Sequence, residues 1–200
     1  MTRRVFLPGA AGAAAFWRPV AELLRDGGEQ RLLAWPGMGN QPADPSVLGM
    51  DDLVALTIAE LEERSDVIAQ SMGGLIAILA AVAAPSRIRR LVLTAASVGL
   101  PVEELGAVDW RPDYRKRFPR AASWIEDPIV DVSAHAASIR ARVLLIWGDR
   151  DPISPVAVGE YLRGIFPDAR LHVVQGGDHD IAITHAGEVA NLIRSHLSEG

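Results

Sequence analysis

Ser71, two aspartates (Asp149 and Asp151) and His179 occur in this order along the chain, each in a short segment that contains glycine. A serine oxygen becomes a nucleophile when a histidine takes its proton and a carboxylate orients that histidine. If the fold brings the three segments together, these residue types predict attack by Ser71 on an acyl carbon.

The residues around Ser71 favour this chemistry. Ala69 and Gly73, two positions before and after it, are small enough for a sharp strand-to-helix turn that presents the serine at its tip. We expect Ser71 to adopt a sparsely populated backbone conformation there, at a helix N-terminus whose N–H groups favour negative charge. The alternative is a serine that only caps the helix, and the motif alone leaves that alternative open.

Either Asp149 or Asp151 could be the carboxylate that orients the histidine, and composition does not distinguish them. Asp149 directly follows Gly148 and is well placed to accept backbone N–H groups within its own turn. Asp151 lies two residues further from the strand, and Pro152 restricts its backbone to extended conformations. We therefore expect Asp151 to orient the histidine and Asp149 to stabilise the turn.

The elements that must position these residues alternate along the chain. Short apolar runs predict strands at residues 4–7, 31–35, 66–69, 91–94, 143–147 and 171–174, each buried on both faces. Helical patterns lie between them, at residues 14–25, 51–63, 72–84, 155–166 (with Ser154 as N-cap) and 180–197. This order predicts an α/β fold: a doubly wound, mostly parallel sheet of about six strands with helices on both faces. Ligands bind beyond the carboxyl ends of such strands, where all three polar segments lie.

Composition indicates one domain, residues 1–200, with 49% apolar residues. The chain lacks cysteine, which excludes disulfides and thiolate ligands, and its formal charge of −5 argues against nucleic acid and anionic membranes as partners. No apolar stretch is long enough to span a bilayer. We expect a small-molecule substrate, no cofactor, and a monomer or homodimer. We also expect no metal: Asp178, His179, Asp180 and His185 are the weak alternative, but His179 already has a role as base. His135, His172 and His196 are expected at the surface or on a strand.

The N-terminus allows two interpretations. Thr2, Arg3, Arg4 and the following alanines are similar to a twin-arginine export signal. Pro8 and Gly9 would interrupt the apolar region of such a signal, so a buried strand and a cytoplasmic protein are the favoured interpretation.

Residues 97–138 separate two strands by more than one crossover requires, which favours a short cap or lid over a solvated helical connection. Five basic residues between Arg111 and Arg120 are expected to face solvent rather than the substrate. Apolar residues in and near this segment either line an acyl pocket or belong to ordinary packing: Met38, Met72, Val98, Leu100, Trp110, Trp124 and Ile153.

Taken together, the motifs resemble those of the α/β-hydrolase superfamily over nearly the whole chain. The matching segments are Leu7-Pro8-Gly9-Ala10, Trp35-Pro36-Gly37-Met38-Gly39, the Ser71 turn, Trp147-Gly148-x-x-Asp151 and the His179 loop. The resemblance implies Ser71 as nucleophile, His179 as base and Asp151 as the acid. It also implies an oxyanion hole made by the backbone N–H groups of Ala10 and Met72.

The chain departs from the family pattern at several points. Ala69 replaces a glycine, Pro8 stands where the family usually has histidine, and Asp178 adds a carboxylate next to His179. From the resemblance we expect the two N-terminal strands of larger relatives to be absent and the cap to be shorter than in many of them. We expect a serine hydrolase that cleaves a carboxylic ester or thioester of a small molecule. The alternatives are a lyase of the hydroxynitrile type, with the same triad as base, and a non-catalytic small-molecule receptor.

Overall fold

The computed structural model describes residues 2–96, 99, 102–127 and 131–199. Six strands in this part of the chain form one parallel sheet in the order β2-β1-β3-β4-β5-β6. The strands are β1 (Arg4–Leu7), β2 (Gln30–Leu32), β3 (Ser65–Gln70), β4 (Ile88–Thr94), β5 (Arg142–Gly148) and β6 (Ala169–Val174). The predicted fold class and each predicted strand are thus confirmed.

The strand order creates a switch point between β1 and β3. The chain leaves β1 toward β2 on one side and later returns to place β3 on the other side, with Leu7 of β1 opposite Ala69 of β3. The connections after these two neighbouring strands therefore run to opposite faces of the sheet. A crevice opens between the two loops at such a point, and it is the usual ligand site of open parallel sheets.

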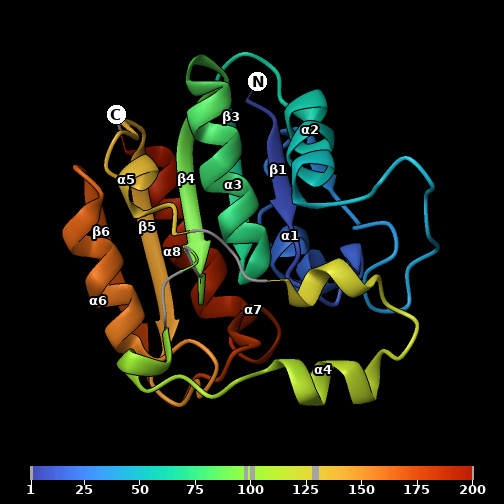
Figure 1. Ribbon diagram of the computed structural model, residues 1–200. Helices are drawn as coiled ribbons and strands as arrows, with labels where there is room; N and C mark the ends of the chain where they lie inside the picture. Colours follow the sequence, from blue (N-terminus) through green and yellow to red (C-terminus); the bar gives the residue numbers. More distant parts are fainter. Residues whose placement is uncertain (1, 97–98, 100–101, 128–130, 200) are drawn as a thin grey trace.

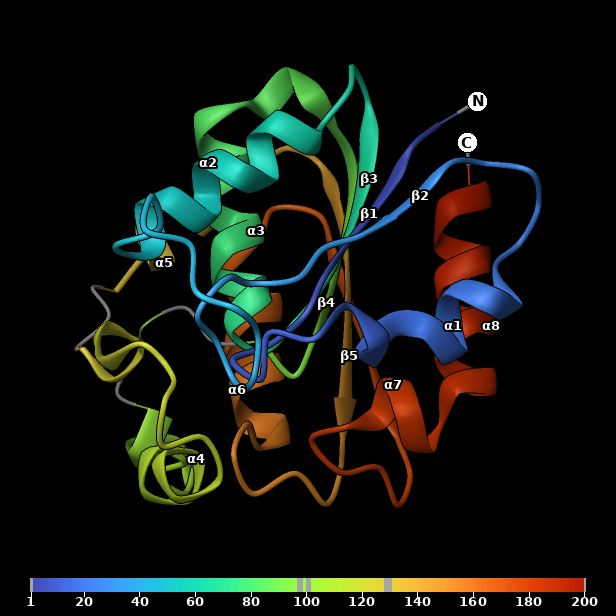
Figure 2. The ribbon, with the colours of Figure 1, turned by 90° about the vertical axis from the view of Figure 1, so that its right-hand side faces the viewer.

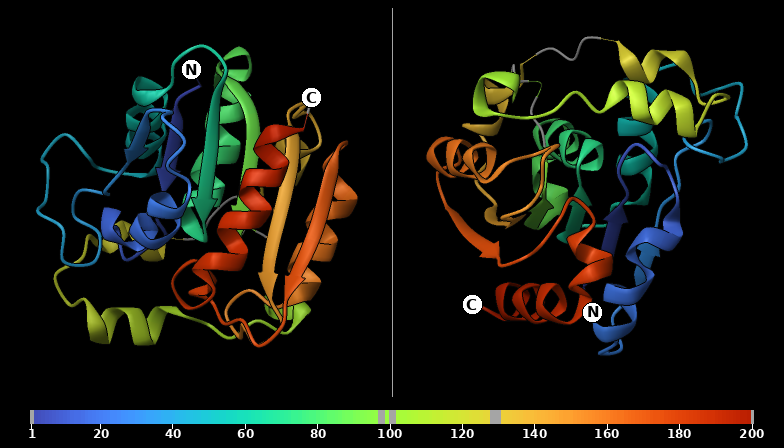
Figure 3. Two further views of the ribbon diagram at one scale, coloured as in Figure 1. Left: turned by 180° about the vertical axis from the view of Figure 1, so that it is seen from behind. Right: turned by 90° about the horizontal axis from the view of Figure 1, so that it is seen from below.

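Helices cover both faces of the sheet (Figures 1 and 2). In Figure 1, α2, α3, α5 and α6 lie in front of the strands, and the view from behind in Figure 3 shows α1 and α8 on the other face. The α-helices are α1 (Arg18–Leu23), α2 (Met50–Glu60), α3 (Met72–Ala83), α4 (Arg111–Arg117), α5 (Ser133–Ala136), α6 (Val156–Ile165), α7 (Ile181–Thr184) and α8 (Ala186–Ser198). Short 3-10 helices are η1 (Ala14–Trp17), η2 (Pro85–Arg87), η3 (Val102–Leu105) and η4 (Ser123–Glu126).

Two apolar clusters, one on each face, hold these layers together. Successive residues of β3 alternate between them, since Val67 and Ala69 belong to the cluster under α2, α3 and α6, and Ile68 to the cluster under α1 and α8. Both sets of side chains are fully buried. The central strands are therefore apolar on both faces, as the sequence predicts.

Several element boundaries differ from the prediction. Strand β2 ends at Leu32 rather than residue 35, because the chain turns there and the N–H of Trp35 binds the carbonyl of Gly12. Ser154 does not cap α6: it is buried, and its hydroxyl accepts from the indole of Trp147 at 3.0 Å. The helix instead begins after Pro155.

The C-terminal helix and the last strand also differ. The predicted helix over residues 180–197 breaks at His185 into α7 and α8. Strand β6 is partly exposed rather than buried on both faces, because it lies at the edge of the sheet with β5 as its one neighbour. His196, expected at the surface or on a strand, lies buried in α8.

Residues 102–127, which we call the cap segment, lie beyond the carboxyl ends of the strands on the side of α2 and α3 (Figures 1 and 2). Two backbone hydrogen bonds tie this segment to the rest of the fold. The N–H of Val108 binds the carbonyl of Pro152 at 2.7 Å, and the N–H of Ala122 binds the carbonyl of Gly37 at 2.9 Å. Among the helices of the described chain, none combines the length and apolarity needed to cross a membrane.

Candidate active site

Ser71 occupies a strained turn between β3 and α3. Its φ of 53° and ψ of −122° lie in a region that residues other than glycine rarely adopt. The turn is held by its N–H, which binds the carbonyl of Thr94 at 3.0 Å. The side chain makes no capping hydrogen bond to α3. The side chain of Ser71 therefore does not cap α3, which excludes the simpler alternative of a helix-capping serine.

Gly73 explains why the turn can form beside β1. A Cβ at this position would lie 2.5 Å from the carbonyl oxygen of Pro8 and 2.7 Å from that of Leu7. Because both atoms belong to the backbone, the first turn of α3 can approach the end of β1 only with glycine here. This contact brings Ser71 next to the loop that follows β1.

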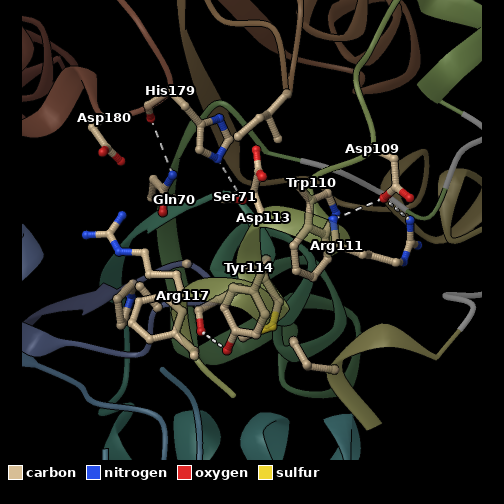
Figure 4. Close-up of a pocket in the computed structure, with 18 of the residues that line it drawn as sticks. Gln70, Ser71, Asp109, Trp110, Arg111, Asp113, Tyr114, Arg117, His179 and Asp180 are labelled. Atoms are coloured by element: carbon tan, nitrogen blue, oxygen red, sulfur yellow. Dashed lines mark hydrogen bonds and ion pairs between the residues drawn. The ribbon is translucent and has the colours of Figure 1, made fainter. Parts of the chain in front are cut away.

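Two hydrogen bonds connect Ser71, His179 and Asp151. Nε2 of His179 lies 3.1 Å from Oγ of Ser71, and Nδ1 lies 2.7 Å from Oδ2 of Asp151 (the Ser71 contact is dashed in Figure 4). An ionised carboxylate only accepts hydrogen bonds, so Nδ1 carries the proton and Nε2 faces the serine hydroxyl as an acceptor. The Asp151 side chain is fully buried and the His179 side chain is 18% exposed. The arrangement can move a proton from Ser71 to His179.

The two aspartates of the β5 loop have different partners. Oδ1 of Asp151 accepts the N–H groups of Ile153 and Ser154 at 2.8 and 3.0 Å, so Asp151 stabilises its own turn as well as binding His179. Asp149 does not make the bond expected within its turn. Its Oδ1 accepts the N–H of Gly176, in the loop after β6, at 2.6 Å.

Ala10 and Met72 belong to the two segments that meet beside Ser71 at the switch point. Ala10 lies in the loop after β1, and Met72 is the first residue of α3. Neither N–H donates to another group in the described part of the chain. The loop after β1 lies close to the Ser71 turn: a Cβ added to Gly9 would come within 3.1 Å of Cβ of Ser71.

Ser71 and His179 open onto a cavity of about 450 Å³ between the cap segment and the carboxyl ends of the strands (Figure 4). Three residues proposed from sequence line it, namely Met72, Trp110 and Ile153. Met38 is fully buried in the core and Trp124 packs against the same core, so neither belongs to the described lining. Val98 and Leu100 lie outside the described residues. The apolar lining is Phe16, Met72, Val102, Val108, Trp110, Phe118, Ile125 and Ile153.

Comparison with known proteins agrees with this architecture. The model of the alpha/beta hydrolase family matches residues 5–134, and a second model, of the alpha/beta hydrolase fold, matches residues 120–186. The chain belongs to the α/β-hydrolase family.

Two curated relatives of this α/β-hydrolase are hydrolytic enzymes. A pimeloyl-[acyl-carrier protein] methyl ester esterase from Neisseria meningitidis is 28% identical over 208 aligned positions, which cover 81% of this chain and 66% of that protein. The chain thus spans about two thirds of the length of that esterase. A 2-hydroxymuconate semialdehyde hydrolase from Pseudomonas putida is 24% identical over 240 positions, covering 96% and 83%.

Solved structures share the α/β-hydrolase fold across the whole chain. A hydrolase from Pseudomonas aeruginosa PA01 superimposes with a TM-score of 0.78 at 19% identity, covering 99% of this chain and 90% of the other. A 2-hydroxy-6-oxo-6-phenylhexa-2,4-dienoate hydrolase from Rhodococcus gives 0.76 at 17% identity, covering 99% and 91%. These likenesses concern the fold alone.

The basic run of the cap segment divides between the surface and the cavity. Arg115 forms an ion pair with Glu126 at 2.6 Å and stays outside the cavity, as do Lys116 and Arg120. Arg111 and Arg117 border the cavity, and Arg117 is at the same time exposed to solvent, so the expected solvated face and the cavity wall overlap at this residue. Arg111 pairs with Asp109 at 3.0 Å, whereas Arg117 makes no ion pair with any residue that the structure describes.

Sequence reasoning missed Tyr114, a buried residue of α4 that also lines the cavity (Figure 4). A signal for it exists: Trp110, Tyr114 and Phe118 recur at four-residue spacing, which places them on one helix face. The charged residues between them obscured this aromatic stripe.

The carboxylate of Asp178 binds groups other than the imidazole of His179. It is exposed and accepts the N–H of Asp180 at 3.0 Å and the hydroxyl of Thr184 at 3.2 Å. That hydroxyl also contacts Nδ1 of His185. No three side chains of the types that bind metal ions come together within the described ranges.

Proposed function

We propose that this chain is a serine hydrolase that cleaves a carboxylic ester or thioester of a small molecule through an acyl-enzyme. Oγ of Ser71 forms a bond to the acyl carbon while Nε2 of His179 takes its proton. The tetrahedral intermediate then releases the alcohol or thiol, which receives that proton from His179. Water attacks the acyl-enzyme, again losing a proton to His179, and the proton returns to Ser71 as the acid leaves.

One observation carries the proposal: the two hydrogen bonds that link Ser71, His179 and Asp151 end at a strained serine that faces a cavity. Asp151 keeps the proton on Nδ1, so Nε2 is ready to act as the base. It also stabilises the imidazolium that forms during the reaction. A small-molecule binding protein has no need of this combination.

The N–H groups of Ala10 and Met72 would bind the oxyanion of the tetrahedral intermediate. Both are without another acceptor in the described structure, and the Met72 N–H lies at the N-terminus of α3, where negative charge is favoured. A donor of this kind stabilises the transition state by roughly 3 kcal/mol. All groups in the proposed sequence of steps come from the chain, the substrate and water.

The cavity is consistent with a small, largely apolar acyl group. Its volume lies in the range of small-molecule sites, and the cap segment supplies much of its apolar wall. We propose that this segment acts as a short cap over the substrate. The similarity to a methyl ester esterase supports an oxygen ester as the first class to test.

A panel of p-nitrophenyl esters from acetate to palmitate tests the proposal. We expect turnover with a preferred chain length, a burst of p-nitrophenol from the acylation step, and a fluorophosphonate adduct on Ser71 detected by mass spectrometry. Ser71→Ala should lower kcat by about a thousandfold or more while the protein still unfolds cooperatively. Ser138→Ala, which removes an exposed hydroxyl bound to the His135 carbonyl, serves as the control.

The alternatives give different results in the same experiment. A lyase that uses Ser71 and His179 only as bases would cleave a cyanohydrin without an acyl-enzyme. A receptor would bind ligands without turnover or adduct. Retention of a tenth of the activity in Ser71→Ala would place the chemistry at another residue.

A further inference from the structure

Tyr114 connects three separate segments through its hydroxyl. The residue lies in α4, is 8% exposed, and donates a hydrogen bond to the carbonyl of Ala10 at 2.8 Å (dashed in Figure 4). The same oxygen accepts the N–H of Gly39 at 3.0 Å. Burial raises the pKa of Tyr114 above its ordinary value, so the hydroxyl keeps the proton that it donates.

The carbonyl of Ala10 accepts its hydrogen bond from a residue of the cap segment, whereas neighbouring carbonyls of the same loop accept theirs from other parts of the fold. The carbonyls of Pro8, Gly9 and Gly12 are bound by the indole of Trp35, the N–H of Gly12 and the N–H of Trp35, at 2.7, 3.0 and 2.9 Å. All of these donors lie outside the cap segment. Of these four carbonyls, that of Ala10 is the one bound by a cap residue, so the orientation of the peptide after Ala10 depends on Tyr114.

The ring of Tyr114 also belongs to the wall of the cavity. It packs edge-on against Trp110 with ring centroids 5.3 Å apart, and against Phe118 at 5.1 Å. All three residues line the cavity that Ser71 and His179 face. A substrate in the cavity would thus contact the side chain that holds Ala10.

We propose that Tyr114 is a positioning residue: its hydroxyl holds the carbonyl of Ala10, on the C-terminal side of this residue, while the Gly12 N–H holds the carbonyl of Gly9 in the preceding peptide, and together the two bonds aim the Ala10 N–H at the oxyanion. This inference rests on the proposed function, because an oxyanion forms only if Ser71 attacks an acyl carbon. The two backbone bonds of the cap segment, at Val108 and Ala122, do not involve Tyr114. Removing the hydroxyl therefore leaves the cap attached, loosens the Ala10 loop, and takes from the Gly39 N–H its acceptor on the cap.

Tyr114→Phe tests the inference, because it removes the hydroxyl and keeps the ring. We expect kcat to fall about tenfold, less than the loss of a whole oxyanion donor, with KM within about twofold of the parent. Rates are expressed per site titrated with a fluorophosphonate, so that misfolded protein does not count. The affinity of a boronic acid that forms a tetrahedral adduct should weaken by the same factor as kcat/KM.

Tyr161→Phe is the matched control, since Tyr161 is the other tyrosine of the chain and is 42% exposed on α6. It should change none of these values. Hydrogen exchange of the backbone amides of residues 9–13 supplies a readout that needs no turnover, and it should accelerate in Tyr114→Phe alone.

The outcomes separate the two proposals. If the parent protein hydrolyses no ester, the proposed function fails, and amide exchange still shows whether Tyr114 holds the Ala10 loop. An unchanged kcat per titrated site, unchanged exchange in residues 9–13, or a loss confined to Tm and to the titratable fraction would each overturn the positioning role.

Discussion

Asp151 binds His179 with one carboxylate oxygen and its own turn with the other. Oδ2 lies 2.7 Å from Nδ1 of His179, while Oδ1 accepts the N–H groups of Ile153 and Ser154. The turn therefore holds the carboxylate through bonds that do not involve the histidine. Preorganisation of this kind lets one buried side chain select the tautomer of the imidazole.

Asp151→Asn should lower kcat by about 10⁴ with little change in fold. The amide oxygen can still accept the two N–H groups of the turn, but the amide NH₂ would face Nδ1 and favour the wrong tautomer of His179. The measurement is kcat with a p-nitrophenyl ester, together with the melting temperature.

Asp149→Asn is the matched comparison in the same loop. Its carboxylate binds the N–H of Gly176, so the change should reduce stability by about 1 kcal/mol and leave most of the activity. An inactive Asp149→Asn variant beside an active Asp151→Asn variant would show that the acid has been assigned to the wrong residue.

Gly73→Ala should disturb both the Ser71 turn and the loop after β1. The added methyl would meet the backbone carbonyls of Leu7 and Pro8, which cannot move as a flexible side chain can. We expect the free energy of unfolding to fall by about 1–3 kcal/mol and kcat to fall with it.

Gly187→Ala controls for the substitution itself. Gly187 lies in α8, and beyond its own turn of the helix no atom of the described structure lies within 4 Å of the place that the added methyl would take, so stability should stay the same or rise by about 0.5 kcal/mol. Urea unfolding and kcat are measured for both variants. Equal effects at the two sites would argue against the close contact at Gly73.

Arg117→Gln should alter the preference between anionic and neutral substrates. Arg117 borders the cavity, is exposed, and makes no ion pair among the described residues, and Figure 4 shows its side chain among those that line the cavity. Removing its positive charge lowers kcat/KM for an ester whose acyl chain ends in a carboxylate, relative to the neutral ester of equal length.

Arg115→Gln provides the comparison, because Arg115 already pairs with Glu126. The ratio of kcat/KM values for the two esters should stay at the parent value in this variant. A parental ratio in Arg117→Gln as well would mean that Arg117 acts as a solvated surface residue and does not attract the substrate.

His196 should make the protein less stable in mild acid. Burial, and then the charge of Arg90, lower its pKa from 6.5 to about 4. The unfolded chain therefore takes up a proton first as the pH falls. The contribution of neutral His196 is complete above about pH 6.5 and is lost as the pH falls to about 4, up to about 3 kcal/mol.

Urea unfolding between pH 4 and 7 checks this expectation against a variant without the titrating group. His196→Gln should flatten the fall in unfolding free energy over that range, whereas His135→Gln, at an exposed histidine of α5, should leave it unchanged. Parallel curves for His196→Gln and the parent protein would mean that His196 titrates normally.

The elements of the sheet and the Ser71–His179–Asp151 cluster were open to prediction because their physics is local or topological. Apolar runs and their spacing determine strands and helices from neighbours in the sequence. A parallel sheet then brings the carboxyl ends of its strands to one edge, so residues that follow β3, β5 and β6 meet there even though Ser71 and His179 are 108 positions apart.

Neither local sequence patterns nor sheet topology determine the contacts of the cap segment. Only the tertiary structure decides them. Tyr114 reaches Ala10 across 104 positions from a short helix outside the sheet, and the same packing turned Arg117 toward the cavity and Arg115 away from it. His196 was buried by the docking of α8 rather than by its neighbours in the sequence. The sequence by itself determined which residues could react and which edge of the sheet would hold them. Only the packing of distant segments decided what surrounds them, because that outcome depends on how whole surfaces fit together.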